Sequence, residues 1–343
     1  MNNPKISVLM PVFNGEKFID AAIKSILNQS FTDFEFLIID DGSTDSSLKI
    51  IQSHQDIRIR LLKNTLNQGL AATLNKGIIA AKGEFIVRMD CDDISHDTRI
   101  EKQLVFMGQN PEIGISGTWM VSMETNETNK YPQTDEECRT FKFFNSPLAH
   151  PTVIIKRELL ISKNLMFSLN YPVCEDFELW RRCMQHTKLG NLCEPLLSYR
   201  VHGSNLSIKS KTLQTKALIN YYNDELSVLG ITPGSINEEL HFALIRPEIS
   251  DLIKSKYTFS DFELWSNVLV DHNTKNKVFE KTYFENLLKE RLTIVALHYL
   301  KSWPTWYYYH KSVLTSGDFF FKEFFRFAIK VLIEKFKKKL AKK

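Results

Sequence analysis

Cysteine is scarce in this sequence of 343 residues, and its spacing points to no chemistry. The five cysteines are an odd number, and no two of them stand as C-x-x-C. A chain of this length buries enough apolar surface to fold without disulfide bonds. The pattern therefore excludes a disulfide scaffold, gives no support to a zinc cluster and favours a reducing compartment.

Long hydrophobic runs are also lacking. No uncharged apolar stretch reaches about 18 residues, so we expect no transmembrane helix. The first residues, Met1 to Lys5, lead directly into a strand pattern without the apolar segment of a signal peptide. We therefore expect a cytoplasmic protein.

Two nucleotide-binding fingerprints are absent. No G-x-G-x-x-G follows the first apolar run, Ile6 to Met10, and the Walker sequence G-x-x-x-x-G-K-S/T does not occur. These absences argue against a dinucleotide-binding Rossmann domain and a P-loop protein. A nucleotidyltransferase is disfavoured as well, because the first strand is not followed by a Gly-rich, Arg-containing phosphate loop.

Composition is that of a folded protein, with 43% hydrophobic and 24% charged residues. At about 150 residues per domain, the length suggests one large domain or two ordinary ones. The net charge is +4, but residues 311–343 hold ten Lys or Arg and only three Asp or Glu. The basic character therefore belongs to the C-terminal tail.

Short β-rich runs alternate with helical periodicity over the first 90 residues or so. Apolar residues recur at helical spacing between the strand-like runs, which are 6–10, 34–39, 57–62 and 85–89. This order predicts right-handed βαβ crossovers, and hence an α/β fold with a doubly wound, mostly parallel sheet. Further strands are expected at 113–121 and 150–155, with a loop at 124–137.

Three carboxylates, Asp90, Asp92 and Asp93, directly follow the fourth strand-like run. Like charges crowded at a strand end repel one another unless a positive group lies among them, and a hard divalent cation is a common solution. The alternative is a solvated acidic turn that caps the next helix. Spacing alone leaves both interpretations open.

Polar segments follow the first two strands too, at 11–14 and 40–43. In doubly wound sheets, ligands bind beyond the carboxyl ends of the strands. The three strand ends therefore predict one crevice. Further along, Asp176 is expected in the first turn of a helix, where backbone N–H groups favour an ionised carboxylate. From Leu213 to Leu300 the pattern becomes helical throughout.

These residues resemble a known family. The motifs SVLMPVFN at 7–14, IDDGSTD at 39–45, NQGL at 67–70, GEF at 83–85, MDCDD at 89–93 and ED at 175–176 are similar to those of the family 2 glycosyltransferases with the GT-A fold. The resemblance covers roughly residues 5–205. It implies an inverting transfer of a sugar from a nucleotide diphosphate donor, with Mg²⁺ or Mn²⁺ as cofactor.

The resemblance also implies roles on the donor side. Pro11 and Phe13 match residues that line the base pocket, and Asp41 matches the carboxylate that accepts the imide N–H of a uracil base. Asp90 matches the first aspartate of the D-x-D motif, and Arg200 is a candidate to neutralise the diphosphate. Helix capping is the alternative role for Asp41, and an ordinary ion pair is the alternative for Arg200.

For metal and base, the resemblance points to three further residues. Asp92 matches the metal-contacting aspartate of D-x-D, His202 stands where relatives carry a histidine near the metal, and Asp176 matches the general base. A structural histidine and a helix-capping carboxylate are the alternatives for His202 and Asp176. His150 is expected to be structural, and Asp93 to do no more than start the next turn.

Two positions depart from the family pattern. Phe13 stands where many relatives have a tyrosine, so that stacking is kept but a hydroxyl contact is lost. Leu74 stands where some relatives have an arginine that contacts phosphate, which leaves the choice of donor open. Arg88, just before the acidic residues, is a candidate to supply part of the missing charge.

The expected organisation follows from these assignments. Residues 1–210 form a GT-A domain, with a nucleotide-sugar half at about 1–95 and an acceptor half at about 96–210, followed by a helical region at 211–300 and an aromatic, basic tail at 301–343. The expected enzyme is a hexosyl- or N-acetylhexosaminyltransferase that uses a UDP-sugar and a glycan or lipid-linked acceptor. A catalytically inactive nucleotide-sugar binding protein or scaffold is the alternative.

The tail offers two interpretations. If helical, it places Lys322, Arg326 and Lys330 on one polar stripe beside a broad apolar face that includes Phe321 and Phe325. Such a helix can lie at a membrane surface with its lysines toward anionic lipids, or it can pack on the enzyme. Nucleic acid is disfavoured as a partner because the basic run is short and terminal.

Truncation tests the membrane interpretation. Removal of the residues after Ser316 is expected to release the protein from anionic vesicles, because the truncation deletes most of the basic and aromatic side chains of the tail. Vesicle co-sedimentation measures the bound fraction, with neutral vesicles as the control. Failure of the full-length protein to bind anionic vesicles would contradict the idea.

Overall fold

The computed structural model describes residues 3–203, 210–232, 234, 238–247 and 256–299. The chain forms two compact units, Met1–Tyr222 and Asn223–Lys343. The predicted tail at 301–343 lies outside the described residues. Among the described helices, none combines the length and the apolar character needed to cross a membrane.

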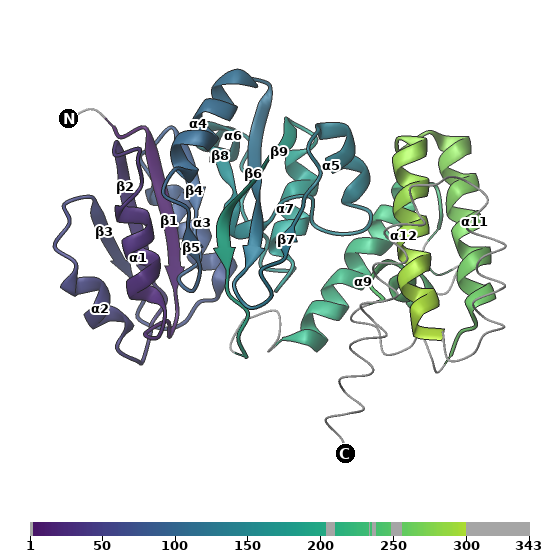
Figure 1. Cartoon of the computed structure of the whole chain (residues 1–343), viewed down its shortest axis with the longest axis horizontal. Helices are drawn as coiled ribbons and strands as arrows, with labels where there is room; N and C mark the ends of the chain where they lie inside the picture. Colours follow the sequence, from purple (N-terminus) through teal and green to yellow (C-terminus); the bar gives the residue numbers. More distant parts are fainter. Residues whose placement is uncertain (1–2, 204–209, 233, 235–237, 248–255, 300–343) are drawn as a thin grey trace, which may run out of the picture. The chain divides into compact units, whose positions relative to one another are not determined.

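The first unit carries one sheet with helices on both faces (Figure 1). Its strands are β1 Ile6–Val12, β2 Phe34–Asp40, β3 Ile59–Lys63, β4 Phe85–Arg88, β5 Ile94–Ser95, β6 Ile113–Ser122, β7 Thr128–Asn129, β8 Ile154–Lys156 and β9 Lys188–Tyr199. Its helices are α1 Ile19–Leu27, α2 Ser47–Ser53, α3 Leu70–Ala80, α4 Arg99–Gln109, α5 Asp135–Phe141, α6 Arg157–Ser162 and α7 Glu175–Cys183, with a 3₁₀ turn η1 at His150–Thr152.

The sheet has the order β3-β2-β1-β4-β8-β6-β9-β5, with β7 paired to β6. The pairs β1/β2, β1/β4, β2/β3 and β6/β9 are parallel and contain the longest ladders. The short strand β8 is antiparallel to both β4 and β6, so β6 and β9 run in the same direction as β1. This confirms the expected α/β class and brings the carboxyl ends of β1, β2, β4 and β9 to one edge.

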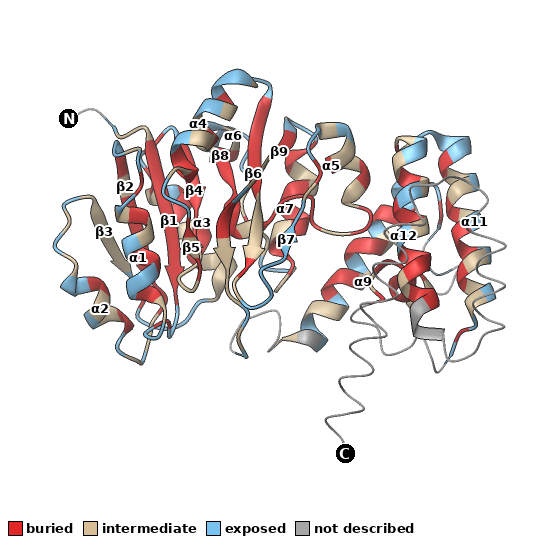
Figure 2. Cartoon of the chain, viewed as in Figure 1, coloured by how far each residue is buried: buried red, intermediate tan, exposed pale blue. Residues whose placement is uncertain are grey.

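Apolar side chains fill both faces of the sheet, which explains why β1 and β2 read as almost unbroken apolar runs. Every residue of β1 is buried (Figure 2). On one face, α1 and α4 cover the strands with Ile23, Ile26 and Ile100. On the other face, α3 and α7 contribute Leu74 and Trp180 to a second core cluster.

Part of the chain between residues 124 and 155 differs from the sequence-based prediction. The segment expected to be a loop, 124–137, contains β7 and the start of α5, whose Thr134 and Glu137 form a capping box. The expected strand at 150–155 is the 3₁₀ turn η1 followed by the shorter β8. Pro151 at the second position of η1 disfavours a strand there because it removes a ladder hydrogen bond.

The long strand β9 was not predicted. Gly190 and Pro195 interrupt its pattern, and its pairing with β6 shifts register at several points. Such bulges break the alternation of apolar and polar residues by which strands are recognised in a sequence.

The described residues of the second unit are mainly helical, in line with the helical pattern of the sequence from Leu213 onward. The helices of this region are α9 Lys211–Val228, α10 Glu238–Ile245, α11 Phe259–Asn276 and α12 Lys281–Tyr299, of which α9 begins in the first unit. Thr258 and Asp261 form a capping box at the start of α11, and Lys277 ends it in the left-handed region at φ 52°. Buried Trp265 donates from Nε1 to His241 Nδ1 at 3.2 Å.

Gly83, just before β4, is the tightest backbone contact that bears on the site. A Cβ there would lie 2.4 Å from Ser7 N and 2.6 Å from the Ile6 carbonyl carbon, and both atoms belong to the buried strand β1. Gly83→Ala is therefore expected to cost about 2 kcal/mol or more of unfolding free energy, measured by denaturant titration.

Gly108 in α4 is the matched control. Nothing lies within 4 Å of the place that a Cβ would take at this residue, and the residue is exposed. Gly108→Ala is expected to raise stability by about 0.5–1 kcal/mol, since alanine is the better helix former. Equal effects of the two substitutions would contradict the role of backbone contact at Gly83.

Candidate active site

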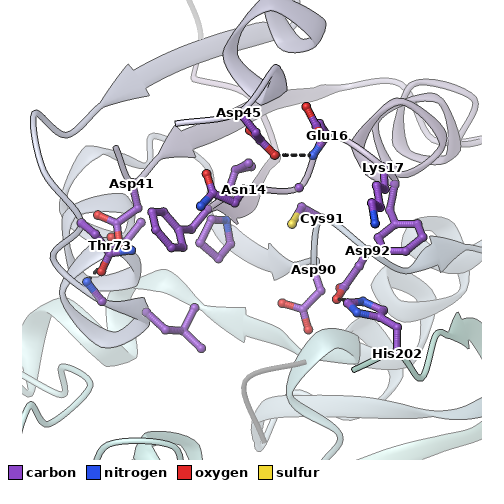
Figure 3. A pocket seen from close by; sticks show the side chains of 18 of the residues that line it. Asn14, Glu16, Lys17, Asp41, Asp45, Thr73, Asp90, Cys91, Asp92 and His202 are labelled. Carbon is purple, nitrogen blue, oxygen red and sulfur yellow. Dashed lines mark hydrogen bonds and ion pairs between the residues drawn. The ribbon is translucent and has the colours of Figure 1, made fainter. Parts of the chain in front are cut away.

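A cleft of about 790 Å³ opens at the carboxyl edge of the sheet (Figure 3). Its wall is built by the segments that follow β1, β2, β4 and β9, together with the start of α3. This is where ligands bind in doubly wound sheets. Six of the eight predicted site residues line the cleft, namely Pro11, Phe13, Asp41, Asp90, Asp92 and His202. Arg200 and Asp176 are placed next to this wall rather than in it.

At one end of the cleft, Asp41 organises the loop before α3. Its Oδ1 accepts hydrogen bonds from Asn64 Nδ2 at 2.7 Å and Gln68 N at 3.0 Å, and its Oδ2 accepts from Gly69 N at 3.0 Å. The carboxylate therefore holds the loop rather than capping a helix. Because a carboxylate has about four acceptor positions, Oδ2 retains capacity for a ligand donor.

Phe13 stands beside this loop with 48% of its surface exposed, whereas Pro11 is buried under the cleft floor. A large exposed ring at a concave site offers a stacking surface for a planar ligand group. Next to it, Asn14 has φ 53°, and its Oδ1 accepts from Thr44 N at 2.8 Å. This turn ties the loop after β1 to the loop after β2.

The acidic residues after β4 form a compact cluster. Ligand oxygens of Asp90, Asp92 and Asp93 all lie within 4.8 Å of one another. Burial raises the pKa of Asp90, and the neighbouring Asp92 raises it further. Burial likewise raises the pKa of Asp93 to about 8, with Asp90 and Asp92 adding to the effect. The strand end therefore concentrates negative charge in a partly dry site.

Protein donors hold each of the three carboxylates. Arg88 Nη1 donates to Asp90 Oδ2 at 2.5 Å, His202 Nε2 lies 2.9 Å from Asp92 Oδ2, and Arg200 N donates to Asp93 Oδ1 at 2.9 Å. Asp93 is fully buried, and its Oδ2 has no hydrogen-bond partner. The expectation that Asp93 only starts the next turn was therefore wrong, because its side chain anchors the chain after β9.

The donor set suits a hard divalent cation. Carboxylate oxygens are the ligands that Mg²⁺ and Mn²⁺ prefer, and an imidazole is also compatible with Mn²⁺. The close grouping of Asp90, Asp92 and Asp93, and the buried Asp93 Oδ2 without a hydrogen-bond partner, fit such an ion.

Phe18 packs against the segment that follows β9. Its ring lies 4.7 Å from the ring of His202, and the Arg200 guanidinium lies 4.7 Å from its centroid. Arg200 Nε also donates to the carbonyl oxygen of Asp92 at 3.0 Å. No sequence signal could identify Phe18, because its partners lie more than 180 residues away along the chain.

A second group of titratable side chains stands at the start of α7. Ligand atoms of His150, Glu175 and Asp176 lie within 4.8 Å of one another, and His150 Nδ1 is 3.9 Å from Glu175 Oε1. Burial raises the pKa of Glu175 to about 7 and that of Asp176 to about 6. Burial lowers the pKa of His150 well below its usual value, so the imidazole is neutral.

Asp176 occupies the predicted place in the first turn of its helix. Burial raises its pKa, and a hydrogen bond from the backbone N–H of Phe177 counteracts that rise. Ser146 Oγ donates to its Oδ2 at 3.4 Å. A carboxyl poised near pH 6 is ionised at neutral pH and remains basic enough to accept a proton.

Sequence comparisons establish the family. A family model described as glycosyl transferase family 2 matches residues 7–164. A protein of Haemophilus influenzae, named an uncharacterized glycosyltransferase, is 31% identical over 317 residues, which cover 88% of this chain and 91% of the relative. The chain belongs to glycosyltransferase family 2.

A second relative of this glycosyltransferase has a named pathway. The O-antigen biosynthesis glycosyltransferase WbnJ of Escherichia coli is 33% identical over 226 residues, which cover 63% of this chain and 84% of WbnJ.

Solved structures share the fold. Residues 1–349 of Staphylococcus aureus TarS, in complex with UDP-GlcNAc, align with a TM-score of 0.60 at 17% identity and cover 86% of this chain and 91% of TarS 1–349. A Pyrobaculum calidifontis mannosyltransferase, in complex with GDP-Man and Mn²⁺, aligns with a TM-score of 0.54 at 14% identity and covers 88% of each chain.

Within this glycosyltransferase, Tyr199 was not singled out from the sequence although it lines the cleft. Burial raises its pKa to about 12, and the charge of Asp90 contributes. Tyr131, across from Asp176, also has a raised pKa because it is buried and faces that carboxylate. Both tyrosines are therefore neutral hydrogen-bonding groups between the cleft and the start of α7.

Proposed function

We propose that this glycosyltransferase moves a hexosyl or N-acetylhexosaminyl group from a UDP-sugar to a hydroxyl of a glycan or lipid-linked acceptor, with inversion at the anomeric carbon. The observation that carries the proposal is the gathering of the predicted site residues in and beside one cleft. The exposed ring of Phe13 and Asp41 line the same cleft as Asp90 and Asp92 of the acidic cluster, and Asp176 lies near enough to Arg88 in the wall of that cleft for the Arg88 charge to lower its pKa.

In this proposal the nucleotide binds at the Asp41 end. Phe13 stacks on the base, Pro11 supports it from beneath, and Asp41 Oδ2 accepts the imide N–H of uracil. The remaining acceptor capacity of Asp41 supports this role. A uracil base at this site is consistent with the UDP-GlcNAc complex of TarS, whereas the mannosyltransferase of similar fold binds a guanine nucleotide, GDP-Man.

The diphosphate lies over the acidic cluster. Asp92 and His202 would hold Mg²⁺ or Mn²⁺, which as a Lewis acid stabilises negative charge on the departing diphosphate. Asp90 orients the ribose and the metal shell, and Arg200 supplies further positive charge next to Asp92.

Asp176 acts as the general base. Its carboxylate takes the proton of the acceptor hydroxyl while that oxygen bonds to the anomeric carbon and the bond from this carbon to the diphosphate breaks. Attack from the face opposite the leaving group inverts the anomeric centre. In this scheme residues 96–210 provide the acceptor half, and the helical region at 211–300 supports it. Residues 301–343 would hold the enzyme at the cytoplasmic face of a membrane.

A thermal-shift screen of nucleotide sugars with Mn²⁺ tests the donor site. A donor at about 100 times its Kd adds about 2.7 kcal/mol to stability, and the wild-type protein should need Mn²⁺ for most of this gain. Asp92→Asn is expected to lose the Mn²⁺-dependent part. Asp20→Asn is the matched control, because Asp20 pairs with Lys24 on α1, outside the cleft. Stabilisation that is unaffected by chelation would remove the metal from the proposal.

Asp176→Asn tests the general base. Turnover is expected to fall by a factor of about 10²–10⁴, whereas donor stabilisation with Mn²⁺ is retained. For the wild-type enzyme, kcat/KM should rise with pH through about 6, as Asp176 loses its proton.

Glu178→Gln is the control for this substitution. It removes a charge from the same helix start, but its carboxylate pairs with Arg182 at 2.6 Å. Unchanged turnover of Asp176→Asn would refute the base role. Donor binding without transfer in the wild-type protein would instead favour an inactive sugar-nucleotide binding protein.

A further inference from the structure

Arg88 ends β4 and is held firmly by its backbone. Its N–H donates to the carbonyl oxygen of Val153 at 2.9 Å, and its own carbonyl accepts a hydrogen bond from Arg99 Nη2 at 2.6 Å. The side chain is only 5% exposed, and its Nε has no hydrogen-bond partner. The guanidinium is therefore confined to one place between the strand end and the protein interior.

Strand geometry directs this side chain toward α7. Residues two apart in a strand point to the same face of the sheet. Ile86 belongs to the core cluster that contains Leu179 and Trp180 of α7. Arg88 consequently points to the α7 side of the sheet, at the level of the cleft that it also lines.

The backbone bond to Val153 places Arg88 beside η1. His150 at the start of η1 has a ring nitrogen within 4.8 Å of carboxylate oxygens of Glu175 and Asp176. At its other end, Arg88 bonds to Asp90 of the acidic cluster. Arg88 thus contacts the acidic cluster through Asp90, and its backbone is bonded to the residue that follows η1, where His150 lies near the carboxylates of α7.

We propose that Arg88 is a positioning residue shared by both carboxylate groups: Nη1 orients Asp90 for the donor, and the guanidinium charge favours the ionised form of Asp176. This inference rests on the proposed function, in which Asp176 takes the acceptor's proton. A single side chain would then affect both the binding of the donor, through Asp90, and the ionisation of Asp176.

Electrostatics agree with the geometry. Burial raises the pKa of Asp176 to about 6 and that of Glu175 to about 7, and the charge of Arg88 lowers both. Among the residues that the structure describes, the groups recorded near Asp176 besides Arg88 include Glu175 beside it, His150 from η1, the Ser146 hydroxyl and the phenol of Tyr131. The imidazole of His150 is neutral because burial lowers its pKa, and the phenol of Tyr131 is neutral because its pKa is raised.

The sign of the effect follows directly. Loss of the Arg88 charge removes an influence that lowers the pKa of Asp176, so this pKa rises and the base is protonated over a wider range. The acid limb of kcat/KM should therefore move to higher pH. A purely structural arginine would scale kcat/KM by the same factor at every pH.

The test compares Arg88→Met with Arg88→Lys. Arg88→Met is expected to move the acid limb up by about one pH unit and to weaken donor stabilisation in the presence of Mn²⁺, because Asp90 loses its partner. Arg88→Lys keeps the positive charge, so the acid limb of the kcat/KM profile should stay near the pH at which it lies in the wild-type enzyme. Arg60→Met is the control, since Arg60 on β3 pairs with Glu35 and bonds to the Ala80 carbonyl oxygen.

A readout without turnover separates this inference from the proposed function. Carboxyl carbon NMR of aspartate-labelled protein follows the titration of Asp176, whose resonance is identified by its loss in Asp176→Asn. The pH midpoint of the Asp176 titration should rise in Arg88→Met and should remain at the wild-type value in Arg88→Lys and Arg60→Met. An unmoved midpoint in folded Arg88→Met protein would overturn the role of Arg88, whatever the enzyme transfers.

If Arg88→Met does not fold, Arg88→Gln provides the second neutral variant for the same titration. Wild-type protein that titrates as expected but transfers no sugar would count against the proposed function alone. A shifted midpoint with an unshifted acid limb would show that Asp176 is not the group whose ionisation limits turnover, and would overturn the coupling.

Discussion

Negative charge held out of water at the end of β4 is the constraint on which the site depends. Ligand oxygens of Asp90, Asp92 and Asp93 lie within 4.8 Å of one another, and neighbouring carboxylate charges add to the effect of burial in raising the pKa of Asp90 and of Asp93. They remain together because a different donor holds each one, from Arg88, His202 and the backbone of Arg200. Removal of any one donor leaves a buried carboxylate without compensation, which costs more than an exposed ion pair would. The geometry of the cleft therefore depends on a balance of charge as much as on apolar packing.

Topology brings two of those donors, His202 and Arg200, to the acidic cluster from far along the chain. His202 and Asp92 are 110 residues apart in sequence, and Arg200 and Asp93 are 107 apart. They meet because β8 reverses the chain direction and β9 then runs parallel to β6, so that the end of β9 returns to the edge where β4 ends. The carboxylates after β4 therefore depend on hydrogen-bonding partners from the segment after β9. Formation of the cleft is thus linked to the pairing of β9 with β6.

The sequence was most informative where local pattern and tertiary environment agree. Buried parallel strands such as β1 and β2 carry almost unbroken apolar runs, and the carboxylates Asp41 and Asp90 come just after β2 and β4, so both the fold class and the cleft could be predicted. β9 escaped prediction because Gly190, Pro195 and its register shifts hide the strand pattern. The tie from Asp93 to Arg200 and the packing of Phe18 on His202 were equally invisible, because they depend on contacts between segments far apart in sequence.

Two buried arginines, Arg88 and Arg99, lie beside the acidic residues after β4. Because they interact with one another and with these carboxylates, the effects of single substitutions on stability should not be independent. Arg99 is fully buried, and its pKa is lowered to about 9 by burial and by the like charge of Arg88, while Asp93 and Asp90 counteract this. Its Nε donates to Gln103 Oε1 and its Nη2 to the Arg88 carbonyl, so it supports the backbone from which Arg88 projects. Arg88 and Arg99 therefore lie close to the acidic residues after β4, and the opposite charges offset part of the cost of burying each group. Loss of Arg88 would remove the ion-pair partner of Asp90 but would also remove the like charge that lowers the pKa of Arg99. The effects of substitutions at these positions on stability should therefore be non-additive, as expected for residues in one charge network.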